Sequence, residues 1–310
     1  MKNSVTIVTI ALLVFLSLNI RAQSQQARID SLVMKMRTAG REWNDYANPL
    51  IEIGEPAVPL LIKNATDASL SQWNRRILMT TLNNIHSEQW VKPALKILFD
   101  YNETPEMRNR VTGGLSGYDL SQVNEELWLL FNSVENQFHK SNLANLLVNS
   151  DTALAYKAFC ELYQTQDGHI QRNALQNLVL LRPHESISWY LDAIQGEDWM
   201  TANLAMDSLI RSALFEAGSF MSLYNLPGVS EEVQWRVIFV LGQRSDSAYA
   251  AFFCEAMESK SWLVRTESAI ALSKLNKETV LKQVSGLQNS STTTVRNNAR
   301  WVVLHLTDKY

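Results

Sequence analysis

The chain has little of what a sheet, a disulfide-rich fold or a nucleic-acid-binding surface requires. Its 310 residues include 11 Gly, 7 Pro and 2 Cys, and no alternation of apolar and polar residues is long enough to predict a sheet. The 28 basic and 31 acidic residues give a net charge of −3, without the basic excess typical of nucleic-acid-binding domains. These absences favour a helical fold and argue against nucleic acid as a partner.

The sequence also lacks the common signatures of catalysis and of metal binding. It contains no Gly-x-Ser-x-Gly nucleophile motif, no phosphate-binding glycine loop and no Cys-x-x-Cys-His haem motif. Its five His residues are scattered, and none has a second ligand at the spacing that a metal site needs. We therefore expect a protein that is not an enzyme and that has no cofactor and no metal.

Long apolar runs are missing except at the beginning of the chain. Residues 5–18 are apolar apart from Thr and Ser, and Lys2 precedes them. This run of 14 residues is shorter than the ~20 apolar residues of a membrane-spanning helix. The pattern is typical of a secretory signal peptide. We predict that residues 1–22 are removed after Ala22 and that the mature chain, without a membrane span, is periplasmic or extracellular; an uncleaved anchor is the alternative.

The main feature that the sequence does contain is a repeat with a period of 31–33 residues. Eight positions, called the anchor residues below, mark it: Arg75, Arg108, Lys140, Gln171, Ala202, Gln234, Arg265 and Arg296. Seven residues after each anchor stands an aliphatic side chain: Leu82, Leu115, Leu147, Leu178, Leu209, Leu241, Leu272 and Val303. A fixed period of this length is the signature of a solenoid.

Each period has the pattern of two amphipathic helices. In residues 245–276, one apolar stripe at helical spacing ends at the polar residues 258–261, and a second stripe follows. Neither helix buries its stripe alone, but stacked neighbours do so continuously. The sequence therefore predicts an all-α fold, an α–α superhelix of about nine two-helix units that fills residues 23–310.

Three segments resemble HEAT repeats, in particular the short variety shared with phycobilisome lyase subunits. These are residues 50–62, 264–272 and 295–299, the last two carrying a Val-Arg pair followed by a small residue. The resemblance implies a solenoid whose second helices, the B helices, line the concave face. The arginine of this motif is replaced at Gln171, Ala202 and Gln234, so a ladder of arginines between repeats is interrupted there.

The outward positions of the predicted B helices are rich in Asn, with Arg and Trp among them. Asn is a poor helix former because its amide competes with the backbone. One reason for so many is a ladder of amides that binds the backbone of an extended peptide; the alternatives are a solvated stripe or bonds between repeats. The candidate partner-binding residues are Arg110, Asn142, Asn145, Arg172, Asn173, Gln176, Asn177, Trp235, Arg236 and Trp301.

Three tryptophans recur two or three residues before an anchor. Trp73, Trp199 and Trp262 are expected in the turn between the two helices of a unit. They form either an aromatic ridge for a partner or caps over the core with the indole N–H reaching water.

Glycines and cysteines each raise one further question. Gly113 and Gly114 fall inside a predicted B helix, which indicates either close approach of a partner to the backbone or tight packing against the next repeat.

Cys160 and Cys254 occupy the same helix position three repeats apart, whereas a disulfide needs Cα atoms within ~7 Å. We expect both thiols to be free.

Taken alone, the sequence favours an exported helical-repeat scaffold that binds a protein or peptide through its concave B-helix face. One alternative is an accessory or maturation factor for an exported protein, which the lyase resemblance implies. The other is a structural spacer in an envelope assembly. The apolar residues around Trp301 in the last helix indicate one of three arrangements: self-association through the C-terminal repeat, docking of a partner there, or packing of Trp301 onto the preceding repeat.

Overall fold

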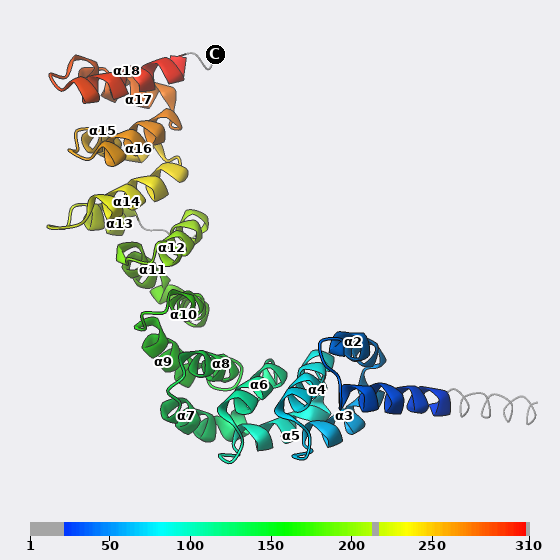
Figure 1. Cartoon of the computed structure of the whole chain (residues 1–310). Helices are drawn as coiled ribbons and strands as arrows, with labels where there is room; N and C mark the ends of the chain where they lie inside the picture. The colour runs from blue at the N-terminus through cyan, green and yellow to red at the C-terminus, as the bar shows by residue number, and fades with distance from the viewer. Residues whose placement is uncertain (1–21, 213–216, 308–310) are drawn as a thin grey trace, which may run out of the picture. The chain divides into compact units, whose positions relative to one another are not determined.

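The computed structural model describes residues 22–212 and 217–307. All regular secondary structure in these two ranges is helical, and they contain no strand (Figure 1). Of the predicted signal peptide, residues 1–21 lie outside the described residues. No helix within the described ranges combines the length and the apolar character needed to cross a membrane.

The helices alternate as predicted and form nine pairs, each with an A and a B helix. The first pair consists of residues 22–36 and α2 (Trp43–Ile53). The later A helices are α3 (Val58–Ala65), α5 (Glu88–Leu98), α7 (Asn124–Ser133), α9 (Thr152–Tyr163), α11 (Ser186–Gln195), α13 (Ala217–Tyr224), α15 (Ala250–Ala256) and α17 (Lys277–Val284). Their B helices are α4 (Gln72–Ile85), α6 (Pro105–Leu115), α8 (Gln137–Leu147), α10 (Gly168–Leu181), α12 (Trp199–Arg211), α14 (Glu231–Gln243), α16 (Trp262–Ser273) and α18 (Thr293–Thr307). Every anchor residue lies on a B helix, so the predicted all-α solenoid is confirmed.

The chain divides into two compact units, residues 1–158 and 159–310, and α9 is shared between them. In each unit the aliphatic side chains seven residues after the anchors form the centre of the core. Those with no exposed surface are Leu82, Leu115 and Leu147 in the first unit, and Leu178, Leu209, Leu241 and Leu272 in the second. Full burial of one such side chain contributes about 1.5–3 kcal/mol. Packing of neighbouring helix pairs therefore supplies most of the stability.

The seven B helices α4, α6, α8, α10, α12, α14 and α16 each begin with a side chain that caps them. The residue four positions before an anchor accepts a hydrogen bond from a backbone N–H of the first turn, which would otherwise lack a partner. The capping residues are Ser71, Thr104, Asn136, Asp167, Asp198, Ser230 and Ser261. The repeat thus specifies where each B helix starts.

Two anchor arginines, Arg75 and Arg108, bind the end of the A helix that precedes their own B helix. Arg75 Nε donates to the carbonyl of Ala65 at 3.1 Å, and Arg108 Nε donates to that of Leu98 at 2.9 Å. Both arginines are 8% exposed. The bonds satisfy carbonyl groups that the end of a helix leaves free.

Glutamine makes the same bond where arginine is missing. Gln171 Nε2 donates to the carbonyl of Tyr163 at 3.2 Å, and Gln234 Nε2 donates to that of Tyr224 at 3.3 Å. The replacement at these two anchors therefore changes the donor and keeps the contact.

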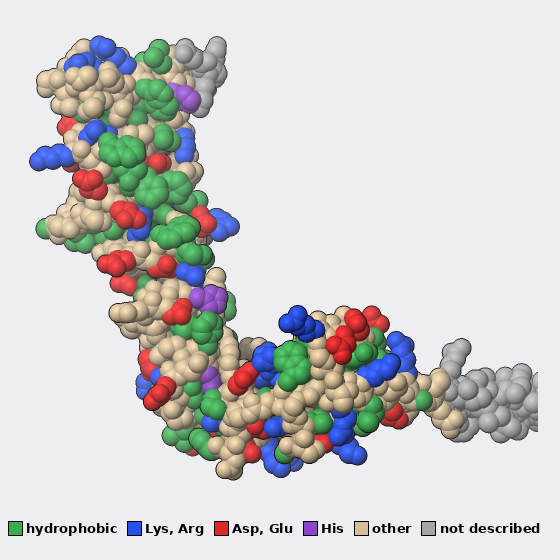
Figure 2. All heavy atoms as spheres, viewed as in Figure 1, with side chains coloured by type: hydrophobic (Ala, Val, Ile, Leu, Met, Phe, Trp, Pro, Cys, Tyr) green, Lys and Arg blue, Asp and Glu red, His purple; other side chains and the backbone are tan. Residues whose placement is uncertain are grey.

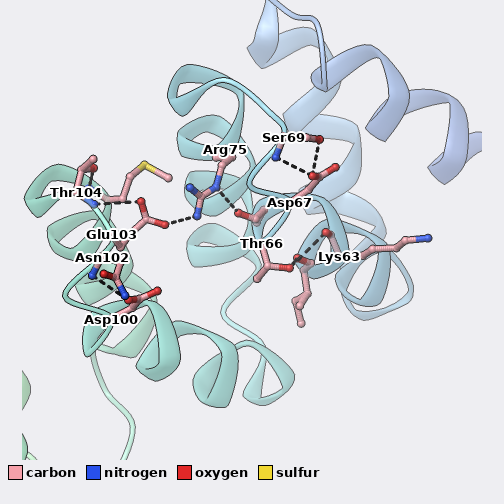
Figure 3. A network of polar contacts seen from close by, with 12 residues as sticks. Lys63, Thr66, Asp67, Ser69, Arg75, Asp100, Asn102, Glu103 and Thr104 are labelled. Carbon is pink, nitrogen blue, oxygen red and sulfur yellow. Dashed lines mark hydrogen bonds and ion pairs between the residues drawn. The ribbon is translucent and has the colours of Figure 1, made fainter.

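Arg75 also links one repeat to the next. Its guanidinium lies between the end of α3 and the loop before α6, where it forms an ion pair with Glu103 (Figure 3). Both side chains are largely buried, at 10% and 13% exposure. A pair with so little solvent around it is screened less than an exposed one.

Within the described residues neither cysteine forms a disulfide bond, and both are half-buried. Burial, together with the nearby charge of Glu258, raises the pKa of Cys254 to about 11. This thiol is therefore protonated at neutral pH and is a poor nucleophile.

Candidate functional site

The B helices α4, α6 and α8 of the first unit pack side by side and leave a hollow of about 510 Å³ on their outer face. We call it the amide groove. Among the described residues that line it, Leu146 alone is aliphatic. The others are Thr80, Asn83, Asn84, Glu106, Asn109, Arg110, Thr112, Gly113, Ser116, Asn142 and Asn145. The surface offers hydrogen bonds and charge rather than apolar contact.

Three predicted residues, Arg110, Asn142 and Asn145, lie together in this groove. Asn142 Nδ2 donates to Asn109 Oδ1 at 2.9 Å across the gap between α8 and α6. Within the described part of the chain, this pairing leaves the amide N–H groups of Asn109 and the Oδ1 of Asn142 without another partner. One donor and one acceptor are thus presented next to each other on the groove wall.

Arg110 carries the uncompensated charge of the groove. It is exposed, and its guanidinium forms no ion pair with any described residue. Glu106 stands one turn earlier on α6 but pairs with Arg76 of α4 instead. Arg76 is also held over the ring of Trp73, 4.9 Å from its centroid. The nearest carboxylate on the same helix face is therefore engaged elsewhere.

Asn83 fixes the floor of the groove. Its Nδ2 donates to the carbonyl of Arg110 at 2.8 Å, and its Oδ1 accepts from Trp90 Nε1 at 2.9 Å. A Cβ on Gly114 would lie 2.2 Å from Asn83 Oδ1 and 2.6 Å from Trp90 Nε1. Gly114 is thus required by packing. Gly113 is exposed in the groove and leaves the space beside Arg110 open.

Four predicted residues lie on α10 in the second unit: Arg172, Asn173, Gln176 and Asn177. Arg172 pairs with Asp198, the capping residue of α12, at 2.8 Å. Asn177 Nδ2 donates to the carbonyl of Asn173 at 2.9 Å, one turn earlier on the same helix. These contacts agree with bonds within and between repeats. A single stripe that joins α10 to the amide groove stays a prediction.

Arg236 is a correction to the predicted surface. It is 3% exposed, and its Nη1 donates to the carbonyls of Ile194 at 2.5 Å and Gly196 at 2.9 Å. The long side chain turns inward because the end of α11 offers carbonyl groups that need donors. Arg236 therefore joins two repeats and is not available to a partner.

The two tryptophans predicted to bind a partner differ in environment. Trp235 is half-buried, and its indole N–H donates to Glu267 Oε2 at 3.3 Å. Trp301 is 44% exposed and is stacked on His305 with the ring centroids 5.1 Å apart. Figure 2 shows hydrophobic side chains gathered on the viewed face of the second unit, over α14 and α16.

The recurring tryptophans before the anchors lie within the first helical turn of the B helices, whereas the sequence predicts them in the loop between the A and B helices. Trp73 Nε1 donates to the carbonyl of Ala39 at 3.1 Å, which agrees with a capping role. Trp199 and Trp262 are 62% and 68% exposed. Trp73, two residues before its anchor, thus makes a contact within the fold, whereas Trp199 and Trp262, three residues before theirs, are exposed.

A second hollow, of about 650 Å³, lies in the second unit where α9 and α11 end, and contains none of the predicted site residues. It is lined by the buried Tyr163, and burial raises the pKa of its phenol, with the nearby charge of Asp192 adding to the effect. Among residues 22–212 and 217–307, no group of three His, Cys, Asp or Glu side chains is placed to hold a metal ion.

Residues 225–303 match a family model for HEAT repeats. No curated protein sequence matches the chain significantly. A structure described as Kap95p bound to RanGDP is 10% identical with a TM-score of 0.51, over 89% of this chain and 43% of the other. The structure of the Escherichia coli protein YibA is 12% identical with a TM-score of 0.45, over 86% of this chain and 97% of the other. A designed armadillo repeat protein is 13% identical with a TM-score of 0.24, over 80% of this chain and 99% of the other. Residues 225–303 thus resemble HEAT repeats, and the described chain has the fold of a helical-repeat solenoid.

Proposed function

We propose that this helical-repeat protein is a scaffold that holds an extended segment of a partner protein in the amide groove. The observation that carries the proposal is the Asn109–Asn142 pair, which presents an amide donor beside an amide acceptor. An extended backbone has the complementary C=O and N–H groups, and main-chain hydrogen bonds of this kind supply affinity for an extended segment.

The chemistry of the groove supports a peptide over an apolar small molecule. Pockets for such molecules are lined mainly by hydrophobic and aromatic side chains with few polar groups. The amide groove has the reverse composition, and α4, α6 and α8 extend it across three repeats. Kap95p, a relative in fold, is described in complex with the protein RanGDP, which supports a protein as the class of partner. The proposal gives the groove no catalytic step.

We propose also that the chain is exported. The support is the N-terminal sequence, where Lys2 precedes the apolar residues 5–18 and a polar segment follows Ala22. N-terminal sequencing of protein recovered from the host's envelope and medium tests this. A mature chain that begins at Gln23 is the expected result, and a chain found only in the cytosol with its first 22 residues would contradict it.

Site-specific photocrosslinking tests the binding proposal. A photoreactive residue at Asn84, exposed in the groove, should capture a partner from the native source, and Asn109→Ala with Asn142→Ala should abolish this capture. The matched control carries the same photoreactive residue at Glu126, which is exposed on the A helix α7. Equal capture at both positions, or capture that the double substitution leaves unchanged, would exclude the groove as the binding site.

A further inference from the structure

We infer that the segment held in the amide groove carries a carboxylate group, and that this group binds Arg110. The inference rests on the proposed function, since it names the chemistry of the peptide for the same groove. It is carried by the arrangement of charges on α4 and α6.

Two charged side chains line the groove, Glu106 and Arg110, and they stand four residues apart on α6. Opposite charges at this spacing lie on one helix face and ordinarily pair with each other. Here the carboxylate of Glu106 pairs with Arg76 of the preceding repeat. The ring of Trp73 also holds the guanidinium of Arg76, which keeps Arg76 in position to pair with Glu106.

Arg110 is left with a full positive charge and free donors. Its guanidinium is planar and presents N–H groups in a fork that fits a carboxylate with two parallel bonds. Its backbone is held in place, because Asn83 Nδ2 binds its carbonyl at 2.8 Å. Gly113, three residues further along the same helix face, has no side chain to cover the guanidinium. The backbone of Arg110 is thus held in place, while the space beside its guanidinium is open.

The neighbouring amides complete a site for an acidic residue in an extended chain. The N–H groups of Asn109, the residue before Arg110, remain available next to the guanidinium. A peptide carbonyl bound there would place the adjoining side chain near Arg110. A Lys or Arg at the same position would meet like charge, while the one acidic side chain of the groove is already neutralised.

A positional-scanning library of decapeptides tests the inference with the full chain. The library is made twice, once as C-terminal carboxamides and once as free acids, to separate a side-chain carboxylate from a terminal one. With the wild type, we expect about tenfold enrichment of Asp or Glu at one position of the carboxamides, or about tenfold stronger capture of the free acids.

Charge reversal gives the decisive comparison. Arg110→Glu should lose the preference for carboxylates and enrich Lys or Arg at the same position, while Arg41→Glu, an exposed reversal outside the groove, should behave as the wild type. Circular dichroism verifies that both variants are folded. Peptides that bind without acidic enrichment, and whose binding Asn109→Ala with Asn142→Ala abolishes, would overturn the inference and leave the proposed function standing. No binding of any peptide would overturn both.

Discussion

His139 is an ionisable residue that the fold removes almost completely from water. It lies in the first turn of α8, is 3% exposed, and its Nε2 has no hydrogen-bond partner among the described residues. Burial, with the nearby charge of Arg108, lowers its pKa from 6.5 to about 4. At neutral pH the imidazole is therefore uncharged inside the first unit.

This pKa predicts a pH dependence of stability. Because the unfolded chain binds a proton at this side chain near pH 6.5 and the folded chain near pH 4, stability should fall as pH falls through this range. The free energy of unfolding should drop by up to about 3 kcal/mol, and His139→Gln should remove this part of the loss. Urea unfolding at pH 7 and pH 4.5 measures it. His184→Gln, at an exposed position, is the control; an unchanged pH dependence in His139→Gln would disprove the prediction.

The adjacent glycines of α6 provide a matched pair. Gly114→Ala should destabilise the chain by about 1–3 kcal/mol, because the new Cβ meets Asn83 and Trp90 at 2.2 and 2.6 Å. Gly113→Ala, whose Cβ would be 3.2 Å from Asn83 Nδ2, should be near neutral because higher helix propensity offsets the contact. Thermal unfolding of both variants decides. Equal effects would show that the two positions are not distinguished by packing.

At the scale of the single helix, the residues at the two ends are specified most strongly. Thr104 caps α6 by accepting from the backbone N–H of Met107. Thr104→Ala should cost about 1 kcal/mol of unfolding free energy, while Thr104→Ser should cost much less because the hydroxyl acceptor is kept. Chemical denaturation measures both, and an Ala variant as stable as the Ser variant would argue against the cap.

The bond between a B helix and the end of its A helix gives another prediction. Arg108→Gln should be more stable than Arg108→Met by about 1–2 kcal/mol, because an amide can still donate to the carbonyl of Leu98. Gln171 and Gln234 make this bond in other repeats. If the two variants have equal denaturation midpoints, the carbonyl of Leu98 does not depend on this donor.

The sequence predicts the helices well because each period repeats the same burial pattern. The anchors and the aliphatic residues after them locate all eight later B helices. The capping residues four positions before the anchors are a second regular signal in the sequence. Arg236 was predicted on the surface because its position in the helix faces outward in other repeats. Its length lets it turn to carbonyl groups 40 and 42 residues earlier, which no local pattern indicates.

The amide groove is only partly predictable from the sequence, for a related reason. The B-helix pattern correctly brings Arg110, Asn142 and Asn145 into one groove. It does not reveal that the Asn83 amide is hydrogen-bonded to the carbonyl of Arg110 and to the indole of Trp90. Nor does it reveal that Glu106 pairs with Arg76 and not with Arg110. Which polar side chains remain available depends on pairing between neighbouring repeats, and this pairing requires coordinates.

For the whole molecule, contacts restricted to neighbouring repeats predict local effects of damage. Gly242→Ala should loosen α14 and α16, because its Cβ would lie 2.7 Å from that of Ala271. Hydrogen exchange should then rise in these helices and stay unchanged in α4 and α6, while Gly114→Ala should give the reverse pattern. Faster exchange throughout the chain in either variant would show that the repeats unfold together.

The hydrogen bonds that join the A and B helices of one pair also affect how the number of repeats can change during evolution. Where a B helix binds only its own A helix, a gene duplication or deletion of one whole period leaves every such bond intact. At α14 the situation differs. Arg236 and Arg244 bind carbonyls of the preceding repeat, among them those of Ile194 and Leu209. We therefore expect homologues to keep α11, α12 and α14 together as one inherited block, and to vary in repeat number only where no bond of this kind joins two repeats.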